Sequence, residues 1–142
     1  MTHPQTKADL IKEHCSVIAK NACCAFTAMW LAGYEPEDSE AIVTVAKAIE
    51  AKVLGNDCTV IWQPFFLWLT GRKIFVEFRK IDSLSDLLDV PGRCAVKFTY
   101  NGKSHWVGVE NCKVAFNCLE DSVCVNKGKP TEARIIKWGL KV

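Results

Sequence analysis

The spacing of hydrophobic residues changes once along this chain, close to residue 72. Before that point apolar side chains recur at intervals of three and four, which is the period of a helix with one buried face. After it they alternate with polar residues, which is the period of a half-buried strand. Helices followed by strands are typical of the α+β class. We therefore expect one α+β domain over residues 1–142, with N-terminal helices packed on a C-terminal antiparallel sheet.

The pattern also locates the individual elements. Thr6 and Asp9 form an opening capping pattern for the first helix, and Asn101-Gly102 predicts a tight hairpin turn because this pair readily takes positive φ. Four helices are expected in the first half, over 6–20, 23–31, 38–54 and a shorter stretch between residues 57 and 71. Six strands are expected in the second half, over 74–78, 94–98, 105–109, 113–116, 123–125 and 134–138, with a short helix at 82–88.

Composition narrows the possible partners. The chain is 49% hydrophobic and 24% charged, with a formal net charge of +2, and no Lys/Arg run is long enough to bind phosphates along a stripe. Nucleic acid is therefore not an expected partner. The longest apolar stretches are shorter than a membrane span requires, and the N-terminus has no secretion signal. We expect a cytoplasmic protein with no membrane span; the sequence does not indicate its oligomeric state.

Eight cysteines are many for a cytoplasmic domain. Four disulfides are the alternative, but the chain is too rich in large apolar residues for a small disulfide-stapled scaffold, so reduced thiols are favoured. Structural zinc prefers paired ligands at Cys-x2-4-Cys, whereas Cys112, Cys118 and Cys124 recur at six-residue intervals. No metal or cofactor is expected.

Three residues, in the order Cys23, His105 and Asp121, have the chemistry of a cysteine nucleophile with its base and orienting acid. Cys23 opens a predicted helix, whose N-terminus lowers a thiol pKa, as does a neighbouring imidazolium. His105 lies on a predicted strand and Asp121 follows the next one. The trio predicts a thiolate that attacks a carbonyl, with His105 donating its proton to the leaving amine.

The residues around the thiol resemble a known family. Cys23-Cys-Ala-Phe-Thr-Ala28 is similar to the Cys-Trp-Ala-Phe-Ser-Ala run around the nucleophile of papain-like cysteine peptidases. The Cys-to-His separation is shorter than in papain, and His105-Trp-Val resembles His-Phe-Val in the compact bacterial peptidases that cleave double-glycine leaders during bacteriocin export. The resemblance covers nearly the whole chain. It implies a papain-like fold, a bacterial or phage origin and a peptide or protein substrate.

Two assignments within the site stay open. Asn117 competes with Asp121 as the residue that orients His105, because papain-like enzymes often use Asn whereas leader peptidases use Asp. Cys24 competes with Cys23 as the nucleophile, although helical spacing places Cys23 in line with Phe26, as in the papain-like pattern.

One position departs from the family pattern. Papain-like peptidases usually have a Gln six residues before the nucleophile, which donates its side-chain amide to the oxyanion, and here that residue is Val17. The oxyanion would then rest on the Cys23 N–H and the Asn21 side chain. Three functions follow: a cysteine peptidase-like hydrolase, a transglutaminase-like acyl transferase with the same trio, or an inactive papain-like binding domain.

Overall fold

The fold is described here from a computed structural model, which describes residues 3–6 and 12–141. Residues 7–11, which include Asp9 and most of the first two turns of the first expected helix, lie outside the described residues. Residues 4–6 are helical. The remaining elements are the helices α2 (Lys12–Asn21), α3 (Cys23–Leu31), α4 (Asp38–Glu50), α5 (Trp62–Thr70), η1 (Leu84–Leu87) and α6 (Val123–Lys127), and the strands β1 (Arg72–Lys80), β2 (Arg93–Tyr100), β3 (Lys103–Glu110), β4 (Lys113–Phe116) and β5 (Lys129–Lys141).

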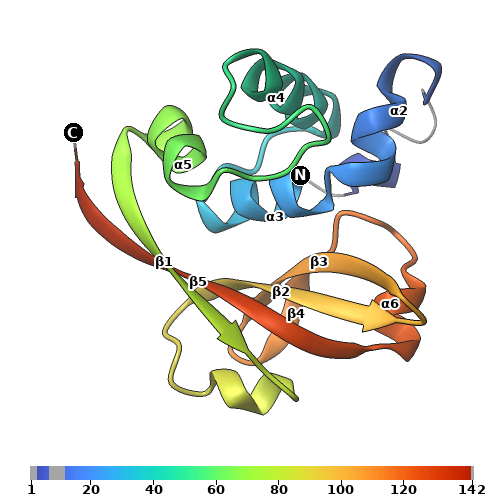
Figure 1. The fold of residues 1–142 in the computed structure, drawn as a ribbon, viewed down its shortest axis with the longest axis vertical. Coiled ribbons are helices and arrows are strands. Elements are labelled where there is room, and N and C mark those ends of the chain that lie inside the picture. The colour runs from blue at the N-terminus through green and yellow to red at the C-terminus, as the bar shows by residue number, and fades with distance from the viewer. Residues whose placement is uncertain (1–2, 7–11, 142) are drawn as a thin grey trace.

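The five strands form one antiparallel sheet in the order β1-β5-β2-β3-β4. Helices α2 to α5 gather on one side of this sheet, and α3 lies closest to it (Figure 1). The chain therefore has the α+β architecture that its hydrophobic spacing predicts. β5 is last in sequence but lies inside the sheet, between β1 and β2.

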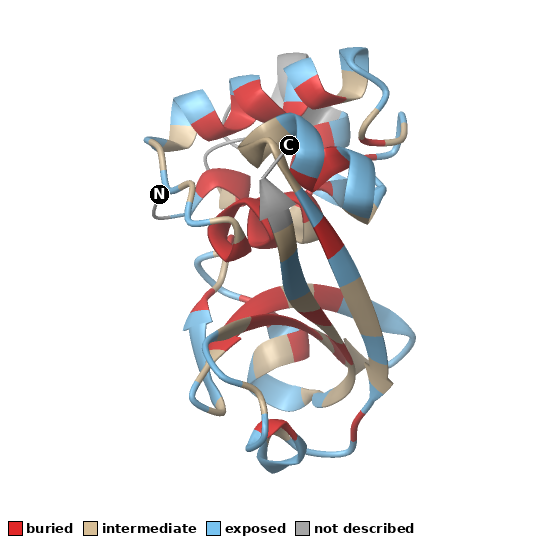
Figure 2. Cartoon of the chain, turned by 90° about the vertical axis from the view of Figure 1, so that its left-hand side faces the viewer, coloured by how far each residue is buried: buried red, intermediate tan, exposed pale blue. Residues whose placement is uncertain are grey.

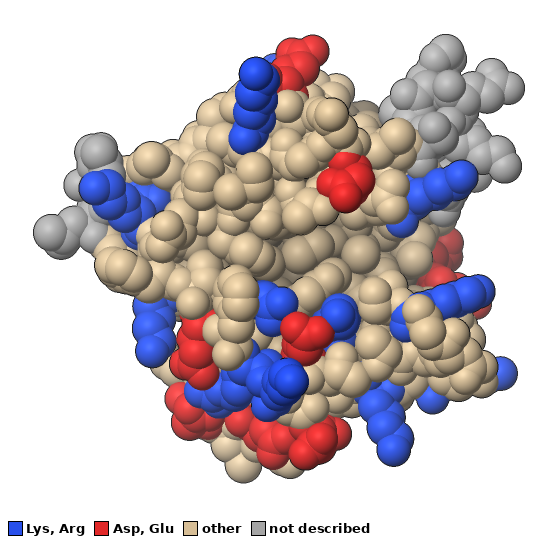
Figure 3. Space-filling view, in the orientation of Figure 1, with Lys and Arg blue, Asp and Glu red and all other residues tan. Residues whose placement is uncertain are grey.

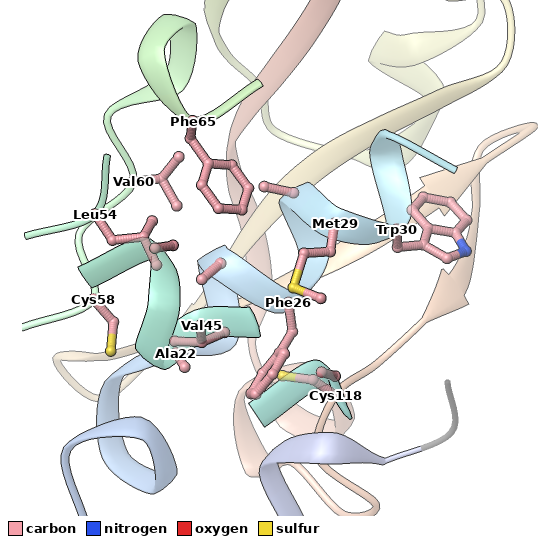
Figure 4. Packing of buried hydrophobic residues seen from close by; sticks show 14 of the residues in the cluster. Ala22, Phe26, Met29, Trp30, Val45, Leu54, Cys58, Val60, Phe65 and Cys118 are labelled. Atoms are coloured by element: carbon pink, nitrogen blue, oxygen red, sulfur yellow. The ribbon is translucent and has the colours of Figure 1, made fainter. Parts of the chain in front are cut away.

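Two hydrophobic clusters cover the two faces of the sheet. The larger one lies between the helices and the sheet and centres on α3, where Phe26 and Met29 are fully buried among residues of α4, α5 and the loop between them (Figure 4). The smaller one lies on the opposite face, where Val96 and Val107 pack against Cys124 of α6. Figure 2 shows buried residues on α3 and on the strands beneath it. The larger cluster fixes α3, and hence Cys23, against the sheet.

A close approach between α3 and β3 sets where the helix sits. A Cβ at Gly108 would lie 2.4 Å from ring atoms of Trp30, so only glycine admits the indole at this position. The same indole stacks on Phe116 of β4 at 6.0 Å between centroids, and the Arg93 guanidinium lies 4.2 Å from its centroid. This contact holds the C-terminal end of α3 on the sheet, and the Thr27 hydroxyl in the middle of the helix lies 3.3 Å from the backbone oxygen of Trp106.

One expected element was of the wrong type, and several expected boundaries were wrong. The segment 123–125 is helical instead of extended, and the Asn126 N–H donates to Ser122 O as in a helical turn. Only Cys124 of this short helix is buried. Three residues are too few to distinguish a helix from a strand. Helix α4 ends at Glu50 instead of 54, because Lys52 takes a φ of 61°. β1 and β5 extend beyond their expected ranges, since they pair over most of their length.

Charged side chains of both signs are intermixed over the sheet half of the molecule in Figure 3. Several of them form ion pairs. Arg79 pairs with both Glu77 and Asp89, and Lys97 pairs with Glu132. No helix in the described ranges is long and apolar enough to cross a membrane.

Candidate active site

Cys23 is the first residue of α3 and is half-buried beside the edge of β3. β4 pairs with β3 only from Gly108 onward, so the side of Trp106 that faces away from β2 has no neighbouring strand. The Thr27 hydroxyl, one turn along α3, donates to the Cys23 carbonyl at 2.8 Å and lies 3.3 Å from the carbonyl oxygen of Trp106. The N–H of Trp106 is directed at the Cys23 thiol. The helix start thus places Cys23 against the residue that follows His105.

His105 is buried in β3, and its Nε2 lies 2.7 Å from Oδ1 of Asn117. The same Oδ1 accepts the backbone N–H of Leu119 at 3.1 Å, which fixes the orientation of the Asn117 amide. Because Oδ1 can only accept, Nε2 of His105 carries the hydrogen and Nδ1 keeps its lone pair. This is the tautomer in which Nδ1 can take a proton from a thiol.

Asp121 does not lie against this ring. It is exposed in the loop before α6, and its Oδ1 accepts a hydrogen bond from the Asn126 side chain at 2.9 Å. Asn117 directly follows the last residue of β4, which places it beside β3, whereas Asp121 comes four residues later in the loop before α6. The structure therefore brings together His105 and Asn117, the alternative that the sequence left open.

No hydrogen bond joins the Cys23 thiol to the His105 ring in the described part of the chain. Alternation along β3 points Trp106 toward the helices, and His105 to the opposite side with Val107. No side-chain nitrogen or oxygen among the described residues is both fully buried and unpaired, so Nδ1 of His105, which has no partner, keeps contact with solvent. Cys23, by contrast, packs against the larger cluster on the helix side, so the thiol and the imidazole lie on different sides of β3.

Burial sets the protonation states of both groups. Desolvation raises the pKa of the Cys23 thiol above its ordinary value, and the backbone N–H of Trp106 opposes this only in part. Desolvation also lowers the pKa of His105, and the hydrogen bond that His105 donates to Asn117 partly opposes this by raising the pKa. The lowered thiol pKa expected from the sequence is thus not found. At neutral pH the resting site holds a neutral thiol and a neutral imidazole.

Cys24 has a different environment. Desolvation raises the pKa of its thiol well above the ordinary value, and the nearby Cys23 raises it further, while Arg134 and Lys97 act in the opposite direction. Seven cysteines have described side chains, and all seven are free: Cys23, Cys24, Cys58, Cys94, Cys112, Cys118 and Cys124.

A pocket of about 390 Å³ opens beside the two cysteines. The sequence did not single out its other walls, because they come from α2, the 57–60 loop, α5, β3 and β5 and meet only in the fold. The lining residues are Lys20, Asn21, Cys23, Cys24, Asp57, Cys58, Thr59, Val60, Trp62, Ser104, Trp106 and Arg134. The thiols therefore face a space large enough for a side chain of a bound peptide.

Besides Asn117, two amide side chains near Cys23, Gln5 and Asn21, have separate roles. Gln5 is buried. Its Nε2 donates to Ala19 O at 2.7 Å, and its Oε1 accepts a hydrogen bond from the Cys118 thiol at 2.9 Å, so both ends of its amide are bonded within the core. Asn21 is exposed and lines the pocket. Val17, at the position where the family pattern has Gln, is 44% exposed.

No protein-family model matches this chain, and searches of curated proteins and of solved structures find no similar protein. Within the described ranges, no group of three or more His, Cys, Asp or Glu side chains is arranged to hold a metal ion.

The raised thiol pKa predicts slow alkylation at rest. Since only the thiolate reacts, iodoacetamide should modify Cys23 several-fold more slowly at pH 8 in the folded protein than in urea. Its rate should continue to rise above pH 9. Peptide mass spectrometry from pH 6 to pH 10.5 measures this for every cysteine. Preferential labelling of Cys23 below pH 8 would instead reveal a resting thiolate–imidazolium pair.

Proposed function

We propose that this chain is a papain-like cysteine hydrolase of the α+β class that cleaves a peptide or amide bond through Cys23, His105 and Asn117. The observation that carries the proposal is the bond of 2.7 Å between His105 Nε2 and Asn117 Oδ1, with Cys23 at the start of a helix beside the next residue, Trp106. Both the tautomer and the helix N-terminus suit nucleophilic catalysis by a thiol.

The chemistry begins with a neutral pair. When a peptide binds, the Cys23 thiol gives its proton to Nδ1 of His105 and its sulfur bonds to the scissile carbonyl carbon. Asn117 Oδ1 accepts the Nε2 hydrogen of the resulting imidazolium and so stabilises it. The amine leaves with the proton from Nδ1, giving a thioester, and water activated by His105 hydrolyses it to free acid and thiol. Because the thiol and the ring are not hydrogen-bonded in the described structure, the proposal requires substrate binding to bring the His105 ring to the thiol.

The developing oxyanion has two donors in reach of the thiol. The N–H of Cys23 is at the start of α3, where backbone N–H groups have no helical partner. The Asn21 side chain lines the same pocket and supplies an amide N–H in place of the absent Gln. The proposed enzyme works in the cytoplasm, where thiols remain reduced.

A proteome-derived peptide mixture tests the activity. The protein is incubated with the mixture under reducing conditions, and new peptide termini are identified by mass spectrometry. Wild type and Cys24→Ala should generate the same set of termini, whereas Cys23→Ala should generate none. An absence of new termini with wild type, or their persistence in Cys23→Ala, would reject the hydrolase and favour a binding domain.

Asn117 and Asp121 can be separated by substitution. Asn117→Ala should slow cleavage on the order of 10-fold or more, because the ring loses its orienting acceptor. Since the Asn117 bond raises the pKa of His105, its loss should also move the acidic limb of the rate–pH profile to lower pH. Asp121→Ala should change neither quantity, because its carboxylate bonds to Asn126. Equal losses in both variants would contradict this assignment.

A further inference from the structure

The pocket beside Cys23 has an arginine built into one wall. Arg134 lies inside the sheet on β5, and its side chain is only 15% exposed. Its guanidinium carbon is 4.2 Å from the centroid of Phe78 and 5.0 Å from that of Trp106. Cation–π contact with two rings restricts the guanidinium to one position, so little side-chain entropy is lost when it binds a ligand.

Most of the hydrogen-bonding capacity of Arg134 is unused. A guanidinium has five N–H donors, and two are engaged here: one with Glu132 at 3.0 Å and one with the backbone oxygen of Ala133 at 3.3 Å. Its Nε has no partner, and since no such side-chain atom in the described ranges is fully buried, it keeps contact with solvent. Donors therefore remain for an acceptor inside the pocket.

The charges around this wall leave a positive excess. Glu132 is shared between Arg134 and Lys97, whose Nζ lies 2.7 Å from the second carboxylate oxygen, so these three residues carry one net positive charge. Lys20 adds a cation to the pocket lining, and Asp57 adds an anion that accepts the Thr59 backbone N–H at 3.1 Å. A carboxylate of the substrate would thus meet more positive than negative charge, and a planar guanidinium matches it geometrically.

We propose that Arg134 is a specificity-determining residue, which binds a side-chain carboxylate of the substrate in the pocket beside Cys23. The inference rests on the proposed hydrolase and names its substrate class: peptides with Asp or Glu close to the scissile bond. The aromatic rings of Trp62 and Trp106, which also line the pocket, would cover the methylene groups of that side chain.

The probes are two pools of acetylated, amidated hexapeptides that are identical except for one fixed position, which is Glu in one pool and Gln in the other. Binding is followed by tryptophan fluorescence in Cys23→Ala, which cannot form a thioester. The Glu pool should bind at least about tenfold more tightly, the value of one charge-assisted hydrogen bond. Adding Arg134→Gln should remove this preference. Arg93→Gln, a control that also removes an arginine stacked on an indole but lies outside the pocket, should retain it.

Equal binding of both pools to Cys23→Ala would overturn the inference, as would a preference that survives Arg134→Gln. The first comparison needs no change at Arg134, so it remains decisive if that variant fails to fold by circular dichroism. Cleavage of the same pools by wild type separates the two proposals. A binding preference without cleavage rejects the hydrolase and retains the carboxylate site, whereas cleavage of both pools at equal rates retains the hydrolase and rejects the site.

Discussion

His105→Ala is expected to slow peptide cleavage on the order of 1000-fold, because the thiol loses the base that takes its proton and the acid that protonates the leaving amine. Nδ1 is the only ring nitrogen available for this step, since Nε2 is bonded to Asn117. Rates of cleavage of a peptide identified in the mixture experiment measure the effect. The fold is checked by circular dichroism.

Chemical rescue separates a catalytic from a structural role for His105. Its buried ring leaves a space when it is removed, and free imidazole added to His105→Ala should restore part of the lost rate. The same imidazole should leave the wild-type rate unchanged. A variant that folds normally and cleaves at the wild-type rate would contradict the assignment of His105 as the base.

Phe26→Ala should lower the free energy of unfolding by about 3–5 kcal/mol. Phe26 is fully buried at the centre of the larger cluster, so truncation removes apolar contacts and leaves a cavity next to Met29 (Figure 4). Urea denaturation followed by circular dichroism measures the change. Phe75→Ala is the matched control: its ring is 65% exposed on β1, and its removal should change stability by no more than about 0.5 kcal/mol. Comparable losses in both variants would show that the larger cluster is not tightly packed at Phe26.

The sequence predicted those parts of the fold that local spacing determines. Alternation located the strand that carries His105, and the three-to-four-residue spacing located α3 with Cys23 as its first residue. The prediction from spacing was wrong at 123–125, because a helix of five residues has too few positions to show a helical period. The sequence pattern also could not predict the strand order, because the pairing of β1 with β5 depends on contacts between segments far apart in the chain.

The candidate site was predictable in its residue types and not in its geometry. The order Cys, His, acid or amide follows from chemistry, but the choice of Asn117 over Asp121 depends on where β4 ends and the loop leaves the sheet. Helix position alone suggested a lowered pKa for Cys23. Desolvation, which depends on the packing of α3 against β3, reverses that direction. Arg134 was not anticipated because its neighbours in the pocket come from other elements.

The position of β5 inside the sheet affects the order of events during synthesis. β1 emerges from the ribosome before β5, which is its only partner among the strands that the structure describes, so it remains unpaired until residues 129–141 have been made. Such non-local pairing slows folding and prolongs the time during which an aggregation-prone, unpaired strand is exposed. Arg134 lies on that same late strand, so the pocket beside Cys23 acquires this wall last. A nascent chain stalled before β5 would carry the thiol without the arginine that we propose selects its substrate.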